Sequence, residues 1–192
     1  MRWLHIYLSM FGLASVLFFG ATGLTLNHPD WFFGESETTL SAKGDMNPKW
    51  LRLSASSDQN ADVDKYEIVE YLRSHHAIRG AVSDLQVQDN ECLVMFKGPG
   101  YAADATIDRT TGKYDVNQTL HGVLSIVNDL HKGRDTGPAW SVLIDVSAVL
   151  MTLISLTGLI LLFYLKLRKK PGLIVGLIGT AAVLAVYWFG VP

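Results

Sequence analysis

The 192-residue sequence contains a single cysteine, Cys92. An intramolecular disulfide is therefore impossible. Leu93, Val94 and Phe96 follow this cysteine closely. We therefore expect Cys92 to be a buried strand residue rather than a reactive or metal-binding thiol.

Charged residues are almost absent from three long segments. Residues 3–26 and 172–190 contain no Asp, Glu, Lys or Arg, and the 24 residues of 142–165 contain only Asp145. At about 1.5 Å per residue, a helix of the 24 residues 142–165 exceeds the hydrocarbon core of a membrane, which is roughly 30 Å thick, and the other two segments are long enough to be candidate spans. Composition therefore predicts a membrane protein with three transmembrane helices. The first segment is longer than the core of a signal peptide, which favours its retention.

Acidic and basic residues are distributed unevenly around these segments. Residues 27–137 contain 17 acidic and 11 basic residues, a net charge of −6, whereas residues 166–170 contain four basic residues and no acidic one. Lys and Arg accumulate in short cytoplasmic loops. We therefore expect a bacterial inner-membrane protein with a cytoplasmic N-terminus and with residues 27–137 in the periplasm. The negative charge of this region excludes nucleic acid as a partner.

The polar region predicts a small α+β domain. Asp62 or Asp64 can cap a helix that runs to about Ala77, and turn residues then separate four short apolar segments. We expect these segments to form an antiparallel meander with strands at 82–88, 92–97, 102–108 and 113–116. From Thr119 the apolar residues recur with a helical period, which predicts an amphipathic helix that leads into the membrane.

The fold class is therefore an α+β membrane protein, in which a small periplasmic domain lies between the first and second of three transmembrane helices. The expected segments are a first transmembrane helix at 1–27, a periplasmic linker at 28–60, the α+β domain at 61–118, the amphipathic lead-in at 119–137, a second transmembrane helix at 138–166, a cytoplasmic loop at 167–171 and a third transmembrane helix at 172–192.

A short fragment occurs twice in the apolar segments. Residues 21–24 read Ala-Thr-Gly-Leu and residues 156–159 read Leu-Thr-Gly-Leu, so Thr-Gly-Leu is common to both. Small residues of this kind allow helices to approach closely. We interpret both fragments as packing surface and expect the first two transmembrane helices to touch.

Histidine is the residue type best suited to bind a metal or haem near a bilayer, because its neutral imidazole brings no charge. Of the six histidines, His75 and His76 lie at the end of the soluble helix and are interpreted as structural. In one continuous helix His5 and His28 would be about 34 Å apart, so they cannot share a haem. No histidine of the second or third transmembrane helix is expected near His5.

His28 and His131 are both expected at the outer face of the membrane, where they could form a bis-histidine site. His121 is the reserve ligand, about 15 Å from His131 if one helix contains both. The competing interpretation is that His5, His28 and His131 are interfacial histidines bonded to the backbone or to lipid headgroups. The chain has no His-Glu-x-x-His zinc motif and no phosphate-binding loop.

Four stretches resemble the PepSY-associated transmembrane family. Residues 105–113 (ATIDRTTGK) are similar to the final hairpin of a PepSY domain, which commonly carries an Asp, a turn and a Gly. Residues 3–5 (WLH), 22–29 (TGLTLNHP) and 129–134 (DLHKGR) resemble segments at the ends of the family's membrane helices. The resemblance extends to Leu165 and implies a PepSY domain held between membrane helices.

Longer members of this family include inner-membrane reductases of siderophore-bound iron that hold haem b between histidines, and other members accompany flavin-bearing exported redox proteins. The resemblance therefore implies a redox subunit in iron metabolism that passes electrons to an exported acceptor through haem b. The candidate ligands are His28, His131, His5 and His121. The chain has one PepSY unit and three spans, fewer than those reductases, so a homodimer or another protein partner would complete the ligand set.

The alternative is a non-catalytic accessory or regulatory protein, anchored among membrane lipids. Its PepSY domain would bind an exported partner or a larger membrane complex. The small size of the chain and its incomplete set of histidine ligands favour this second hypothesis.

Overall fold

The computed structural model describes residues 1–30, 36–51 and 63–192. These residues form two compact units, a sheet unit of residues 19–142 and a helix unit of residues 1–18 with 143–192. The chain passes between the two units within the helices α2 (Leu13–Asn27) and α5 (Gly137–Tyr164).

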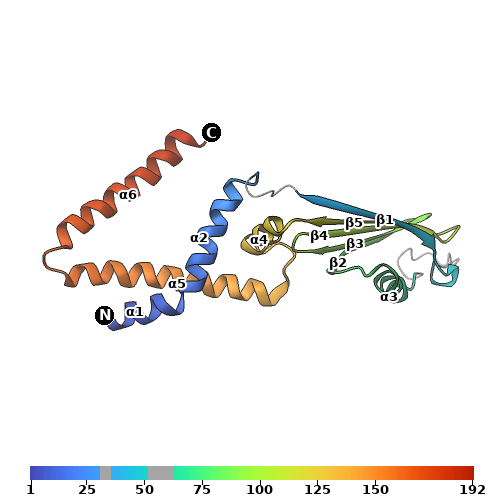
Figure 1. The fold of residues 1–192 in the computed structure, drawn as a ribbon, viewed down its shortest axis with the longest axis horizontal. Helices are drawn as coiled ribbons and strands as arrows, with labels where there is room; N and C mark the ends of the chain where they lie inside the picture. The colour runs from blue at the N-terminus through green and yellow to red at the C-terminus, as the bar shows by residue number, and fades with distance from the viewer. Residues whose placement is uncertain (31–35, 52–62) are drawn as a thin grey trace. The chain divides into compact units, whose positions relative to one another are not determined.

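Five antiparallel strands form the sheet, in the order β1-β5-β4-β3-β2 (Figure 1). The predicted meander is confirmed, and the bounds of its first three strands agree with the prediction to within one residue. Its four strands are β2 (Ala81–Val87), β3 (Glu91–Gly98), β4 (Tyr101–Asp108) and β5 (Lys113–His121).

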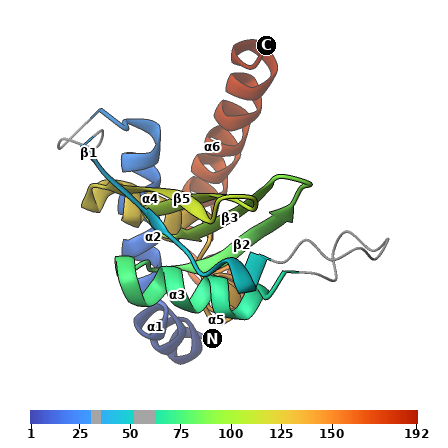
Figure 2. The same cartoon turned by 90° about the vertical axis from the view of Figure 1, so that its right-hand side faces the viewer.

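Helix α3 (Lys65–His76) covers one face of the sheet (Figure 2). Asp64 caps its first turn, as predicted, whereas the alternative cap Asp62 lies outside the described residues. Ile68 and Leu72 of α3 are fully buried. They pack with inward-facing residues of the strands into one apolar core, which also contains Cys92, Val94, Phe96, Ala103, Ala105, Ile107, Tyr114 and Val116.

Strand β1 (Glu37–Asp45) lies within residues 28–60, for which the sequence predicted a linker and no strand. It pairs with β5 along its whole length, from Glu37 opposite His121 to Asp45 opposite Lys113. A 3-10 helix at Pro48–Leu51 (η2) follows it. The strand was missed because its side chains are mostly exposed and lack an apolar alternation. Its stability comes from the ladder with β5, which involves residues far away in the sequence.

Residues 119–121, which were predicted to begin a helix, are the end of β5. The helix α4 (Val123–Lys132) begins only after Gly122 and ends at Gly133, whose φ of +68° is left-handed. His121 and His131 therefore do not share one helix, and the spacing of about 15 Å, which assumed that they do, does not apply. Leu120 fits both a helical and a strand pattern, and pairing with β4 and β1 decides in favour of the strand.

The first apolar segment was predicted as one helix but forms two. Helix α1 (Arg2–Phe11) meets α2 at Gly12, where the pair bends by 58°. The straight-helix distance of about 34 Å between His5 and His28 therefore does not apply. The break falls at a glycine, which is a frequent site of helix kinks.

The first two apolar segments touch within the helix unit, as predicted. A Cβ atom added to Gly12 would lie 2.8 Å from Cδ1 of Ile154, so the missing side chain permits the close approach. Nearby, the hydroxyl of Ser147 on α5 donates a hydrogen bond of 3.0 Å to Oγ of Ser15.

Helices α5 and α6 (Lys169–Gly190) are each long and apolar enough to cross a membrane. The bent pair of α1 and α2 adds a third span if it counts as one. Helix α6 begins three residues before the predicted third helix at 172, because Lys169 and Lys170 form its first turn. The described residues thus form a mixed membrane protein with two or three apolar helices and an antiparallel sheet.

Candidate functional site

His5 of α1 is held by α5 within the helix unit. Its Nδ1 lies 2.9 Å from the hydroxyl oxygen of Thr157, which is a buried residue. The ring lies against the next residue, Gly158, where an added Cβ would be 3.3 Å from Cε1 of the imidazole. The hydroxyl of Thr157 is the hydrogen-bond partner of the imidazole, and the absence of a side chain at Gly158 leaves room for the ring.

The surroundings of Thr157 determine the tautomer of His5. A threonine hydroxyl has one proton to donate and two lone pairs. The oxygen of Thr157 lies 2.8 Å from the carbonyl of Leu153 and 3.0 Å from that of Ile154, and a carbonyl can only accept. The hydroxyl proton therefore goes to a carbonyl, and His5 donates from Nδ1. In the neutral imidazole this tautomer places the lone pair on Nε2.

His131 of α4 has a similar neighbour in the sheet unit. Its Nδ1 is hydrogen-bonded to the hydroxyl of Thr22, a buried residue of α2, and its Cε1 would lie 3.7 Å from a Cβ added to Gly23. The ring also meets Phe19 edge to face, with 5.2 Å between the ring centroids. A second hydrogen bond between α2 and α4, 2.8 Å long, joins Thr25 to Asn128.

The two Thr-Gly pairs of the apolar fragments, Thr22-Gly23 and Thr157-Gly158, therefore each hold a histidine. Sequence reasoning identified them as packing surface and missed this role, although their repetition was the available signal. Among the residues that the structure describes, neither His5 nor His131 uses Nε2 in a hydrogen bond. Each of these imidazoles thus has one nitrogen fixed by threonine and one nitrogen available to a ligand.

The other two candidate ligands lie elsewhere in the sheet unit. His28 is half-buried and directly follows the end of α2, and His121 is the last residue of β5. The contacts of His131 are with Thr22 and Phe19, not with His28. Thr22 precedes His28 by six residues, about 9 Å along a helix. No group of three or more His, Cys, Asp or Glu that could hold a metal occurs within residues 1–30, 36–51 and 63–192.

His75 and His76 take part in an aromatic cluster at the end of α3. The ring of His75 stacks on Tyr71 at 3.9 Å, and Nε2 of His76 lies 2.9 Å from the hydroxyl of Tyr114. Burial and the neighbouring His75 lower the pKa of His76, whereas burial and Tyr71 raise the pKa of Tyr114 to about 12. Both groups are therefore neutral near pH 7, which agrees with a structural role.

The Asp-turn-Gly segment that resembles a PepSY hairpin is a local turn. One carboxylate oxygen of Asp108 accepts hydrogen bonds from the hydroxyl of Thr110 at 2.6 Å and from the backbone N–H of Thr110 and Thr111. These bonds lower the pKa of Asp108 to about 2. Gly112 then takes a φ of +75°, which favours glycine. Asp108 therefore stays ionised and organises the turn.

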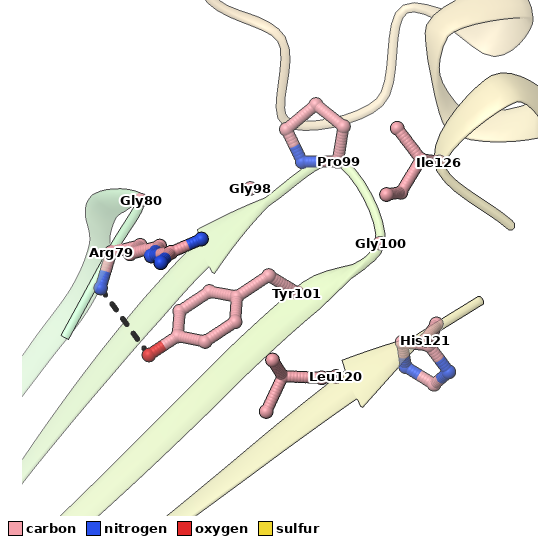
Figure 3. A pocket seen from close by; sticks show the side chains of 9 residues that line it. All are labelled: Arg79, Gly80, Gly98, Pro99, Gly100, Tyr101, Leu120, His121 and Ile126. Carbon is pink, nitrogen blue, oxygen red and sulfur yellow. Dashed lines mark hydrogen bonds between the residues drawn. The ribbon is translucent and has the colours of Figure 1, made fainter. Parts of the chain in front are cut away.

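A pocket of about 240 Å³ lies at one end of the sheet, where β3, β4 and β5 meet α4 (Figure 3). The ring of Tyr101 and the side chain of Leu120 form part of its wall, and Ile126 of α4 and Pro99 lie at its side. The hydroxyl of Tyr101 accepts from the backbone N–H of Arg79 and donates to Gln118.

Comparison with known proteins gives one match. The sequence model of the family described as "Putative PepSY_TM-like" matches residues 1–192, the whole chain. No curated protein and no solved structure matches it.

Proposed function

The chain belongs to the PepSY-associated transmembrane family, and from this premise we propose that it is a membrane redox subunit that passes electrons through histidine-ligated haem b. The observation that carries the proposal is the hydrogen bond from His5 to Thr157, because it leaves an imidazole lone pair at Nε2 within an apolar helix pair. The bond between His131 and Thr22 gives a second histidine of the same kind.

We propose His5 and His131 as iron ligands through Nε2. Histidines that bind metals typically engage their other ring nitrogen with a protein group, which fixes the tautomer and the orientation of the ring. Thr157 and Thr22 would have this role here. A bound haem b would supply a one-electron carrier, since its iron alternates between the ferric and ferrous states.

The second axial ligand differs between the two positions. His28 is our candidate for the outer site because it follows α2, the helix that holds His131, and His121 is the reserve ligand. His5 is the only histidine within residues 1–18 and 143–192. A second histidine for an iron on His5 would therefore come from a second copy of the chain or from a protein partner.

The finer topology belongs to the same proposal. We place the N-terminus in the cytoplasm and residues 27–137 in the periplasm of a bacterial inner membrane, with α1 and α2 together as the first of three spans. The net charge of −6 in residues 27–137 and the four basic residues at 166–170 support this orientation. Electrons would then pass toward an exported acceptor, and the family resemblance suggests iron acquisition as the setting.

A visible absorption spectrum of the protein, extracted gently from its native membrane, tests the proposal. Oxidised and dithionite-reduced samples should show a Soret band and sharp reduced α and β bands. His5→Ala and His131→Ala should each remove at least half of the Soret absorbance per protein. His75→Ala is the matched control, since His75 stacks on Tyr71 in the soluble domain, and it should leave the spectrum unchanged.

A protein without haem, both alone and in any complex isolated with it, would contradict the redox role. The accessory role would then be favoured, in which the PepSY domain binds an exported partner and the Thr-His hydrogen bonds only fasten helices. Loss of haem in the His75→Ala control to the same extent as in the other variants would also contradict the ligand assignment.

A further inference from the structure

The core face of the sheet is longer than the helix that covers it. Helix α3 has 12 residues, or about 18 Å, whereas the 8 residues of β4 span about 27 Å. Tyr101 and Leu120 are paired across β4 and β5 at the uncovered end. Both continue the inward-facing positions of the core, because side chains alternate along a strand. The pocket of Figure 3 therefore opens beside an apolar surface.

Side chains of both charge signs lie around this apolar surface. Arg79 lines the pocket itself, and the adjoining hollow is lined by Lys97, Arg134, Asp129 and Asp135 together with His121 and Tyr101. The ion pairs among the described residues join Lys43 to Asp115 and Arg134 to Asp129. Arg79 and Lys97 therefore have no carboxylate partner in the part of the chain that the structure describes.

Two acidic side chains, Asp129 and Asp135, line the adjoining hollow, and the ion pairs of the described residues join neither of them to Arg79. One carboxylate oxygen of Asp129 accepts a hydrogen bond of 2.9 Å from the backbone N–H of Gly100, and the other faces Arg134. It therefore does not neutralise Arg79. A planar guanidinium with free N–H groups at the edge of an apolar pocket is suited to a carboxylate, which it can bind with two parallel hydrogen bonds.

We propose that this pocket binds a small organic acid, in which an aromatic or branched aliphatic body carries one carboxylate. The body would lie against Tyr101, Leu120 and Ile126, and the carboxylate would meet the guanidinium of Arg79. The pocket volume of about 240 Å³ limits the size of the ligand, since it equals the volume of about eight water molecules of roughly 30 Å³ each. This site does not depend on haem, so its test is separate from that of the redox role.

The experiment uses the full chain in phosphatidylcholine nanodiscs, with empty nanodiscs as the blank. The probe is 4-(trifluoromethyl)benzoate, titrated by fluorine NMR, and its uncharged counterpart is 4-(trifluoromethyl)benzamide. We expect saturable binding of the benzoate and at least tenfold weaker binding of the benzamide. Arg79→Gln should weaken benzoate binding at least tenfold, whereas Lys43→Gln, which removes an exposed cation paired with Asp115 on the outer sheet edge, should leave it unchanged.

Three results would overturn the proposal. The first is benzoate binding no greater than in empty nanodiscs, and the second is equal binding of benzoate and benzamide. The third is that Arg79→Gln binds the benzoate as tightly as the wild type does. Arg79 is exposed and its side chain is not part of the core, so circular dichroism should confirm that this variant folds like the wild type.

Discussion

The position of the hydroxyl proton of Thr157 determines which neutral tautomer His5 adopts. Because the hydroxyl of Thr157 donates to a backbone carbonyl of its own helix, it can only accept from the imidazole. The geometry thus selects one of the two neutral tautomers before any ligand binds. Such selection is testable in the protein without haem, and so it is separate from the question of whether haem binds.

Thr157→Val should abolish this selection while keeping the shape of the side chain. Ring-nitrogen NMR shifts of ¹⁵N-histidine-labelled protein at pH 8, assigned with His5→Gln, should show the Nδ1–H form in the wild type. The variant should show a mixture of both tautomers. If haem binds, its affinity should fall by about 10- to 100-fold, the usual cost of removing such a partner.

Thr157→Ser is the matched control, since serine keeps the hydroxyl and should keep the wild-type shifts. Identical ring-nitrogen shifts in Thr157→Val and in the wild type would contradict the assigned tautomer, whatever the haem content.

Residue type alone made the histidines candidate ligands, because few side chains can ligate iron near a bilayer without bringing charge. It could not identify Thr157 and Thr22 as their partners. Those contacts depend on which helix lies beside which, and they join residues 152 and 109 positions apart. The Thr-Gly-Leu fragments at 22–24 and 157–159 indicated close helix packing. They did not indicate which histidine each threonine would contact.

Among the elements, those with an apolar pattern were predictable and those stabilised by pairing were not. Helix α3 has a cap and an apolar stripe of its own, and strands β2, β3 and β4 are bounded by turn residues. Strand β1 has neither feature, and only its ladder with β5 defines it. The same ladder extends β5 to His121, so one missed strand also produced the error in the position of that candidate ligand.

Gly12 provides a test of the packing between α1 and α5. Gly12→Leu would place a side chain where the Cβ alone comes within 2.8 Å of Ile154. Such overpacking costs about 1–3 kcal/mol. For a chain of this size the midpoint of thermal unfolding falls by about 2–4 °C per kcal/mol. We expect this decrease in a detergent melt, together with altered His5 ring-nitrogen shifts because α1 is displaced from Thr157.

Gly20→Leu is the matched control, because an added Cβ at Gly20 meets nothing within 4 Å. It should change the unfolding midpoint by less than Gly12→Leu and leave the His5 shifts intact. Equal effects of the two substitutions would show that helix composition, rather than the contact at Gly12, determines the stability.

At the scale of the whole molecule, the charge distribution predicts which parts of the chain face each side of the membrane. The acidic sheet domain and the basic residues at 166–170 lie on either side of α5 in the sequence, and α5 is long enough to cross a bilayer. If α5 crosses the bilayer, these two regions lie on opposite sides of it. The location of the C-terminus depends in addition on α6, and so it distinguishes two spans from three.

Labelling of single cysteines with a membrane-impermeant maleimide tests this topology in intact spheroplasts. In a Cys92→Ser background, Asp84→Cys should react from outside, and Lys170→Cys should react only after lysis. Val191→Cys should react from outside if α6 crosses the membrane, since three spans place the two termini on opposite sides. Reaction of Lys170→Cys in intact spheroplasts would reverse the orientation. The wild-type protein is the blank, because Cys92 is fully buried in the sheet and should not react until the domain unfolds.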